Sequence, residues 1–170
     1  WTALLSAGFR GAATAIPSDF RRTRRGVDVR YVEGGYVQNL ATIPPESLSI
    51  VKTSLKQIDY PIEVRQLEFL KSCIEGVREH GASFVCCSYP VPLEYRKSLV
   101  NYDSKQKLIS SFLKLSLVPF KDFNKEMTLD IAVHYCDVAH LNQAGVELFN
   151  ASLIEWLRQE KLLPKPSRTD

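Results

Sequence analysis

Between residues 61 and 89 an amphipathic helix pattern leads directly into a continuous apolar run, and this order constrains the fold more than any other feature. Five apolar residues recur at helical spacing opposite a charged face: Ile62, Leu67, Leu70, Ile74 and Val77. Gly81 is expected to end the helix, because glycine readily adopts the left-handed conformation found at helix ends. The apolar run at 83–89 predicts a buried parallel strand, which Pro90 and Pro92 end.

The same order recurs towards the C-terminus. A second helical pattern covers about residues 104–115 and is followed by a short apolar piece at 117–120. A last helix is expected after Asn142, whose side chain can cap free backbone N–H groups, and it should run to about residue 162. Alternating helices and strands predict the α/β class, with a parallel sheet covered by helices.

The length and composition indicate one domain. With 170 residues, of which 45% are hydrophobic and 24% charged, the chain has the size and composition of a single globular unit. We expect residues 1–163 to form this domain and residues 164–170 to form a tail. Residues 1–60 are assigned only loosely, to a short strand at 27–32 and a helix at 47–58.

Charge and hydropathy exclude several kinds of partner. A net charge of +3 is too small to indicate a nucleic-acid partner. Four arginines within residues 21–25 are interpreted as a solvated loop, with an anion-binding surface as the alternative: Arg21, Arg22, Arg24 and Arg25. No apolar stretch approaches the roughly 18 residues of a membrane-spanning helix. The chain begins with Trp1 and shows no signal peptide, so the true N-terminus is expected elsewhere.

The cysteines and two of the histidines do not point to a metal or a cofactor. Cys73, Cys86, Cys87 and Cys136 lack the paired C-x-x-C spacing of zinc or redox sites. Free thiols are favoured over a disulfide, with Cys86 and Cys87 as small buried hydrophobes on opposite faces of a strand. His134 could join a metal site with Asp130 or Asp137, but no second carboxylate–histidine spacing supports it. His80 is expected at a helix C-terminus, where a cation is favourable.

The informative segment is Y-C-D-V-A-H-L-N-Q-A-G at 135–145, where Asp137 precedes His140 by three positions just ahead of a helix. In a turn, the carboxylate can accept a hydrogen bond from the imidazole Nδ1–H. Nε2 then stays free to take a proton from a nucleophile. An Asp-x-x-His pair alone is more often a local hydrogen bond than a catalytic pair.

The string D-x-x-H-L-N-x-x-G resembles the last conserved block of the SGNH/GDSL hydrolase superfamily. The resemblance implies that Asp137 is the catalytic acid and His140 the catalytic base, with Leu141, Asn142 and Gly145 at the helix start. It also implies a three-layer α/β/α, flavodoxin-like fold with a parallel sheet, incomplete in this chain. The strand ending at Tyr89 and the segment Phe120-Lys121-Asp122-Phe123 resemble its last two strands. Glu33-Gly34-Gly35-Tyr36 resembles a turn of cell-surface members that act on polysaccharide acyl groups, which suggests a bacterial cell envelope.

The nucleophile of that superfamily has no counterpart in this sequence. Neither a Gly-Asp-Ser block nor a G-x-S-x-G elbow occurs. Ser18 follows Pro17 rather than an apolar strand, and Ser88 lies late in the buried strand, so both are interpreted as structural.

The chain is therefore expected to be the C-terminal part of a serine-dependent acyl-ester hydrolase or O-acyltransferase, inactive without an upstream segment of the same protein. Its substrate is expected to be an acyl ester, with acylated glycans among the candidates, and no cofactor or metal is implied. The alternative is a non-catalytic module of the same fold that binds a carbohydrate or a protein partner.

This interpretation leads to three structural expectations. An oxygen of Asp137 should lie within about 3.2 Å of a ring nitrogen of His140, or be bridged to it by one water. This pair should sit at the carboxyl edge of the sheet near Tyr89 to Val91. A sheet that lacks its first strand should also expose a strand edge or an apolar helix face.

Overall fold

The computed structural model describes residues 29–32 and 36–163, which centre on a two-stranded parallel sheet. Strand β3 (Cys86–Ser88) pairs with β4 (Phe120–Asp122), so that Cys86 lies opposite Phe120 and Ser88 opposite Asp122. A separate antiparallel pair is formed by β1 (Val29–Val32) and β2 (Tyr36–Asn39). The chain is therefore mixed α/β with a small parallel sheet, which confirms the predicted class.

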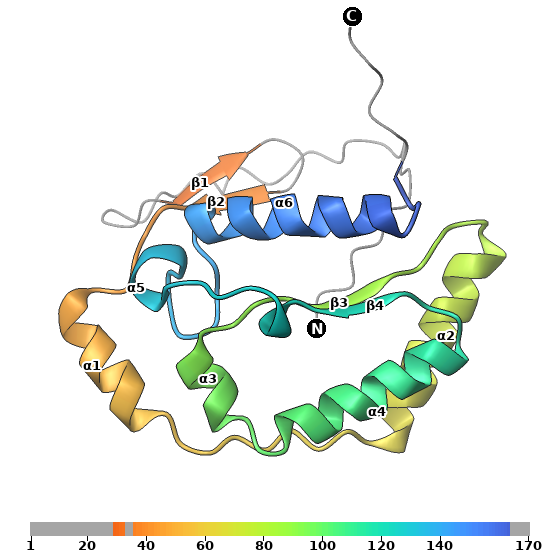
Figure 1. Cartoon of the computed structure of the whole chain (residues 1–170), viewed down its shortest axis with the longest axis horizontal. Coiled ribbons are helices and arrows are strands. Elements are labelled where there is room, and N and C mark those ends of the chain that lie inside the picture. Colours follow the sequence, from red (N-terminus) through yellow and green to blue (C-terminus); the bar gives the residue numbers. More distant parts are fainter. Residues whose placement is uncertain (1–28, 33–35, 164–170) are drawn as a thin grey trace, which may run out of the picture.

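Helices lie on both sides of β3 and β4. The helices of the described residues are α1 (Pro45–Ser54), α2 (Val64–Glu79), α3 (Leu93–Ser98), α4 (Tyr102–Leu115), the 3-10 helix η2 (Phe123–Lys125), α5 (Ile131–His134) and α6 (Gln143–Gln159). Figure 1 shows α6 on one side of the strands and α2 and α4 on the other. The three long helices predicted from apolar spacing are confirmed as α2, α4 and α6.

Two apolar clusters fill the spaces between the strands and these helices. Towards α2 and α4, the buried residues are Ile74, Phe84, Ile109, Leu113 and Val118. Towards α6, the ring of Phe123 lies edge-to-face against Trp156, with 5.9 Å between the ring centroids. Cys86 packs against the first cluster and Cys87 against the second, because successive strand side chains point to opposite faces. All four cysteines are free thiols, as predicted.

The last strand lies where Phe120-Lys121-Asp122-Phe123 was expected to form one, and the end of α4 explains why it does not begin at residue 117. The apolar piece at 117–120 was expected to be extended, but Leu117 has φ +53° and its N–H bonds to the Lys114 carbonyl. The N–H of Val118 bonds to the Leu113 carbonyl, which completes a Schellman ending of α4. Since this ending occupies residues 116–118, β4 starts only at Phe120. Gly81 ends α2 in the same way with φ +70°, as predicted.

The helix expected at 47–58 is shorter in the structure. Helix α1 ends at Ser54, and the following residues are extended. Ile58 forms a parallel bridge with Leu99, in which its N–H bonds to the Ser98 carbonyl at 2.8 Å. The backbone of Ile58 is therefore used for tertiary pairing, which a helix would prevent.

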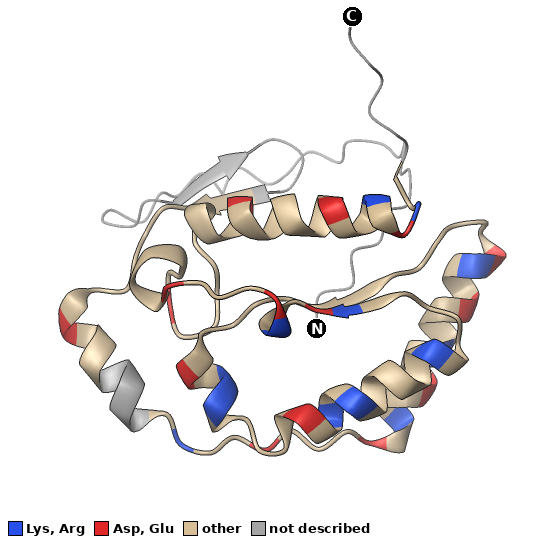
Figure 2. Cartoon of the chain, in the orientation of Figure 1, with Lys and Arg blue, Asp and Glu red and all other residues tan. Residues whose placement is uncertain are grey.

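Among the described residues, both edges of the two-stranded parallel sheet lack a further strand. Charged residues of both signs lie along α2, α4 and α6, whereas β3 carries none (Figure 2). In the part of the chain that the structure describes, β3 and β4 each have a single strand neighbour. The expectation of an unpaired strand edge is therefore met for these residues.

The start of α6 packs tightly on the end of α5. The Asn142 side chain caps α6 by accepting the N–H of Gly145 at 3.1 Å, as predicted, and donates to the Val133 carbonyl at 2.7 Å. A Cβ on Gly145 would collide with the His134 carbonyl oxygen and crowd a methyl of Leu141. Glycine is therefore required here by the close approach of two backbones.

We predict that Gly145→Ala lowers the free energy of unfolding by about 1–3 kcal/mol, because the backbone carbonyl that it meets cannot move aside easily. Gly76→Ala is the control: it lies within α2 with nothing near its added Cβ. That change should raise stability by about 0.5–1 kcal/mol. Urea unfolding of both variants measures the difference, and equal effects would contradict the tight approach at Gly145.

Candidate functional site

Asp137 and His140 lie in one closed turn between α5 and α6. Nδ1 of His140 lies 2.8 Å from Oδ2 and 3.0 Å from Oδ1 of Asp137. Oδ1 also accepts the backbone N–H groups of Ala139 and His140, each at 2.8 Å. The base of the turn is closed by an antiparallel bridge between Tyr135 and Leu141. The predicted contact between Asp137 and His140 is confirmed.

The electrostatics of the turn favour an ionised carboxylate. Partial burial acts to raise the pKa of Asp137, but the N–H groups of Ala139 and His140 and the imidazole together outweigh it. The pKa of Asp137 is therefore lowered from its ordinary value. The stability that this shift contributes is present above the unfolded pKa and is lost as the pH falls through the folded pKa.

The His140 imidazole is open to solvent on its far side. Its side chain is 72% exposed and that of Asp137 52%. Within residues 36–163, no hydrogen bond to Nε2 of His140 is present. With Nδ1 facing the carboxylate, the neutral ring holds its proton there. Nε2 can then accept a proton from a group that approaches from outside the turn.

The turn lies near the carboxyl end of β3. Tyr89 directly follows this strand, and its pKa is raised by burial and then by the negative charge of Asp137. Tyr135, which is 1% exposed and anchors the turn in the core, has its pKa raised by burial and then by the charges of Tyr89 and Glu94. This agrees with the predicted position near Tyr89.

A buried asparagine that sequence reasoning missed holds this strand end in place. Oδ1 of Asn124 accepts the N–H of Val91 at 2.8 Å, and Nδ2 donates to the Tyr89 carbonyl at 2.9 Å. Asn124 thus ties both sides of Pro90 to η2. The available signal was a polar residue two positions after the last strand, which is weak by itself.

Asp122 and Tyr102 extend the same polar network. The Tyr102 hydroxyl donates to Oδ1 of Asp122 at 2.8 Å, and the pKa of Tyr102 is raised by burial and by this contact. Nδ2 and the backbone N–H of Asn124 also donate to Oδ1. Oδ2 of Asp122 is buried with no hydrogen-bond partner.

Ser88, the serine candidate that lies within the described residues, is not brought to His140. Ser88 donates from Oγ to Oε1 of Gln106 at 3.1 Å, and no hydrogen bond joins it to His140. Ser18, the cluster at 21–25 and the turn at Glu33 to Gly35 lie outside the described residues.

The remaining histidines have local backbone partners. Nδ1 of His134 accepts the Asp130 N–H at 2.9 Å, and Nδ1 of His80 lies 2.7 Å from the Gly76 carbonyl. Among the described residues no three potential metal ligands converge.

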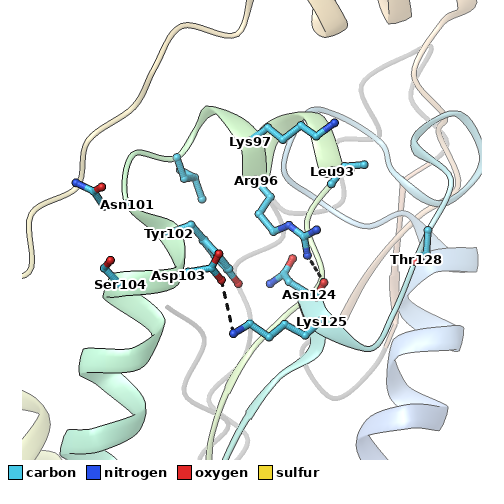
Figure 3. A pocket seen from close by; sticks show the side chains of 11 residues that line it. Leu93, Arg96, Lys97, Asn101, Tyr102, Asp103, Ser104, Asn124, Lys125 and Thr128 are labelled. Atoms are coloured by element: carbon cyan, nitrogen blue, oxygen red, sulfur yellow. Dashed lines mark hydrogen bonds and ion pairs between the residues drawn. The ribbon is translucent and has the colours of Figure 1, made fainter.

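Two cavities adjoin the carboxyl ends of the strands. One, of about 700 Å³, lies between α3, the start of α4 and η2, and it is polar (Figure 3). In it Arg96 donates to the Asn124 carbonyl, and Lys125 lies 3.6 Å from Asp103. The other, of about 530 Å³, lies beside β3 and includes Tyr89.

Comparison of the chain with family models, curated proteins and solved structures finds no match. None of the helices in the described ranges is both long and apolar enough to cross a membrane. The assignment of a function therefore depends on the geometry of the site.

The three histidines should differ in tautomer when neutral. His140 and His80 should carry the proton on Nδ1, because each presents that atom to an oxygen. His134 should carry it on Nε2, because its Nδ1 accepts a hydrogen bond. Nitrogen chemical shifts of the rings measure this directly. Asp137→Ala should shift His140 towards a mixture of tautomers and leave the other two unchanged; an unaltered His140 would contradict the orienting role of Asp137.

Asn124→Ala should lower the free energy of unfolding by about 2–6 kcal/mol, because the Tyr89 carbonyl and the Val91 N–H lose their partner at about 1–3 kcal/mol each. Asn150→Ala, at an exposed position of α6, is the matched control and should change stability by less than about 0.5 kcal/mol. Equal effects of the two substitutions in thermal unfolding would refute the role of Asn124.

Proposed function

We propose that this chain supplies the acid–base pair of a serine-dependent acyl-ester hydrolase or O-acyltransferase of the SGNH/GDSL type. The observation that carries the proposal is the contact of Nδ1 of His140 with both carboxylate oxygens of Asp137, while Nε2 is left to solvent. This arrangement suits a general base whose tautomer and orientation are held by a carboxylate.

The surroundings of the pair support the same proposal. Helices on both sides of β3 and β4 are compatible with a three-layer α/β/α arrangement (Figure 1). The unpaired edge of β3 offers backbone groups to a further strand. We place the missing nucleophile on an upstream segment that completes the sheet, so that its hydroxyl reaches Nε2 of His140.

The reaction then needs no metal or cofactor. The serine Oγ attacks the ester carbonyl carbon as Nε2 of His140 takes its proton, and the bond to the alcohol breaks as His140 returns that proton to the leaving oxygen. Water, or the hydroxyl of an acceptor, next attacks the acyl-enzyme with the same help from His140. Asp137 stabilises the imidazolium formed at each stage.

The chain by itself should hydrolyse an aryl ester no faster than its His140→Ala variant, because no nucleophile or oxyanion hole stands beside the imidazole in the described ranges 29–32 and 36–163. Extended by the upstream coding sequence, the protein should gain activity that falls about 10²- to 10⁴-fold in His140→Ala. Asp137→Ala should lower it less steeply, since Asp137 acts through His140.

His80→Ala serves as the control, because this exposed histidine lies at the end of α2 and has no part in the reaction. Initial rates at fixed ester concentration compare the variants. If the extended protein keeps its ester hydrolysis after His140→Ala, the proposal is refuted. Strong activity of the chain alone that requires His140 would point to a nucleophile within it.

A further inference from the structure

The cavity of about 530 Å³ beside β3 is lined in part by Tyr89, which directly follows this strand. The pKa of Tyr89 is raised by burial and then by the negative charge of Asp137. The other walls are the segment 58–62, the first turns of α2 and the first half of α4. A group bound in this cavity therefore lies beside Tyr89, at the carboxyl end of β3.

The lining of this cavity is mainly apolar. Its branched aliphatic members come from four segments of the chain: Ile58 and Ile62, Val91, Leu99, and Ile109. Four tyrosines add aromatic surface: Tyr60, Tyr89, Tyr95 and Tyr102. Binding here would draw mainly on the removal of apolar surface from water.

Several polar groups of the lining already have partners within the protein. Ser88 donates to Gln106, and the Tyr102 hydroxyl donates to Asp122. The charge of Lys105 is balanced by Asp59, whose Oδ1 lies 2.5 Å from Nζ. A ligand rich in hydroxyl groups would lose its hydrogen bonds to water and find few in exchange, and an ion would meet no uncompensated charge.

We infer that this cavity binds the acyl chain of the substrate, a neutral hydrocarbon chain of several carbons. The inference rests on the proposed function for the identity of the ligand as an ester. Size also favours a chain over an acetyl group: one water occupies about 30 Å³ in the liquid, so an acetyl methyl would leave most of the cavity filled with water. The apolar lining gains most from a ligand that displaces that water.

The test uses neutral alcohols as probes, added to the full chain labelled at its isoleucine methyl groups. Affinity should rise by about fourfold for each added methylene from 1-butanol through 1-hexanol to 1-octanol. The shifted signals should be those of Ile62 and Ile109, which line the cavity. Xylotriose, a neutral sugar of similar bulk, should not shift them.

Two variants locate the binding. Ile62→Trp places a large ring in the cavity and should weaken 1-octanol binding at least tenfold. Val64→Trp adds the same ring two residues away on a side chain that is 73% exposed, and should leave binding unchanged. If Ile62→Trp fails to fold, as judged by near-ultraviolet circular dichroism, nuclear Overhauser contacts from 1-octanol to Ile109 in the unaltered chain decide the question.

The outcomes separate this inference from the proposed function. No gain from 1-butanol to 1-octanol, shifts away from the cavity, or binding of xylotriose would each overturn the inference. In the extended protein, hydrolysis that requires His140 but is as fast for acetyl as for octanoyl esters would also overturn it and leave the proposed function intact. If alcohol binding depends on chain length but the extended protein shows no hydrolysis that requires His140, the apolar site is supported and the proposed function is refuted.

Discussion

The parallel pairing of β3 with β4 is the constraint on which the arrangement of the site depends. Three residue pairs bring the carboxyl ends of both strands to one edge, so Tyr89 and Asn124 meet there although they are 35 positions apart in the chain. The same pairing separates the two apolar clusters, since Cys86 faces one and Cys87 the other. A shift of one residue in either strand would exchange these faces.

The site combines an exposed turn with a buried support. The Asp137–His140 contact is made within four residues and depends on backbone N–H groups of the same turn. Its position depends on Tyr135 and on the cap at Asn142, both of which are almost completely buried. An exposed imidazole on a buried support suits a general base, because the ring can reach a group outside the turn while the support holds its orientation.

Local patterns were sufficient for much of this description. The helices α2, α4 and α6 follow from apolar spacing with a Gly81 end and an Asn142 cap, and the Asp137–His140 contact follows from a spacing of three in a turn. The last strand was expected at 120–123 from the resemblance, and β4 confirms this. The apolar pattern placed it too early, at 117–120, because the residue type of Leu117 does not indicate its left-handed conformation. The helix predicted at 47–58 was too long, because the backbone of Ile58 pairs with Leu99, a partner 41 positions away.

By itself, the sequence determined the class of the fold, the long helices and the identity of the Asp137–His140 pair, because each depends on residues that lie close together in the chain. Only the tertiary structure decided the roles of Asn124 and Gly145 and the walls of the cavity beside β3. Each of these depends on approaches between distant segments, such as the Asn124 side chain to the Tyr89 carbonyl or the Gly145 backbone to His134. Such approaches depend on how the apolar faces of helices and strands pack together. The spacing of apolar residues along one segment does not indicate which other segment packs against it.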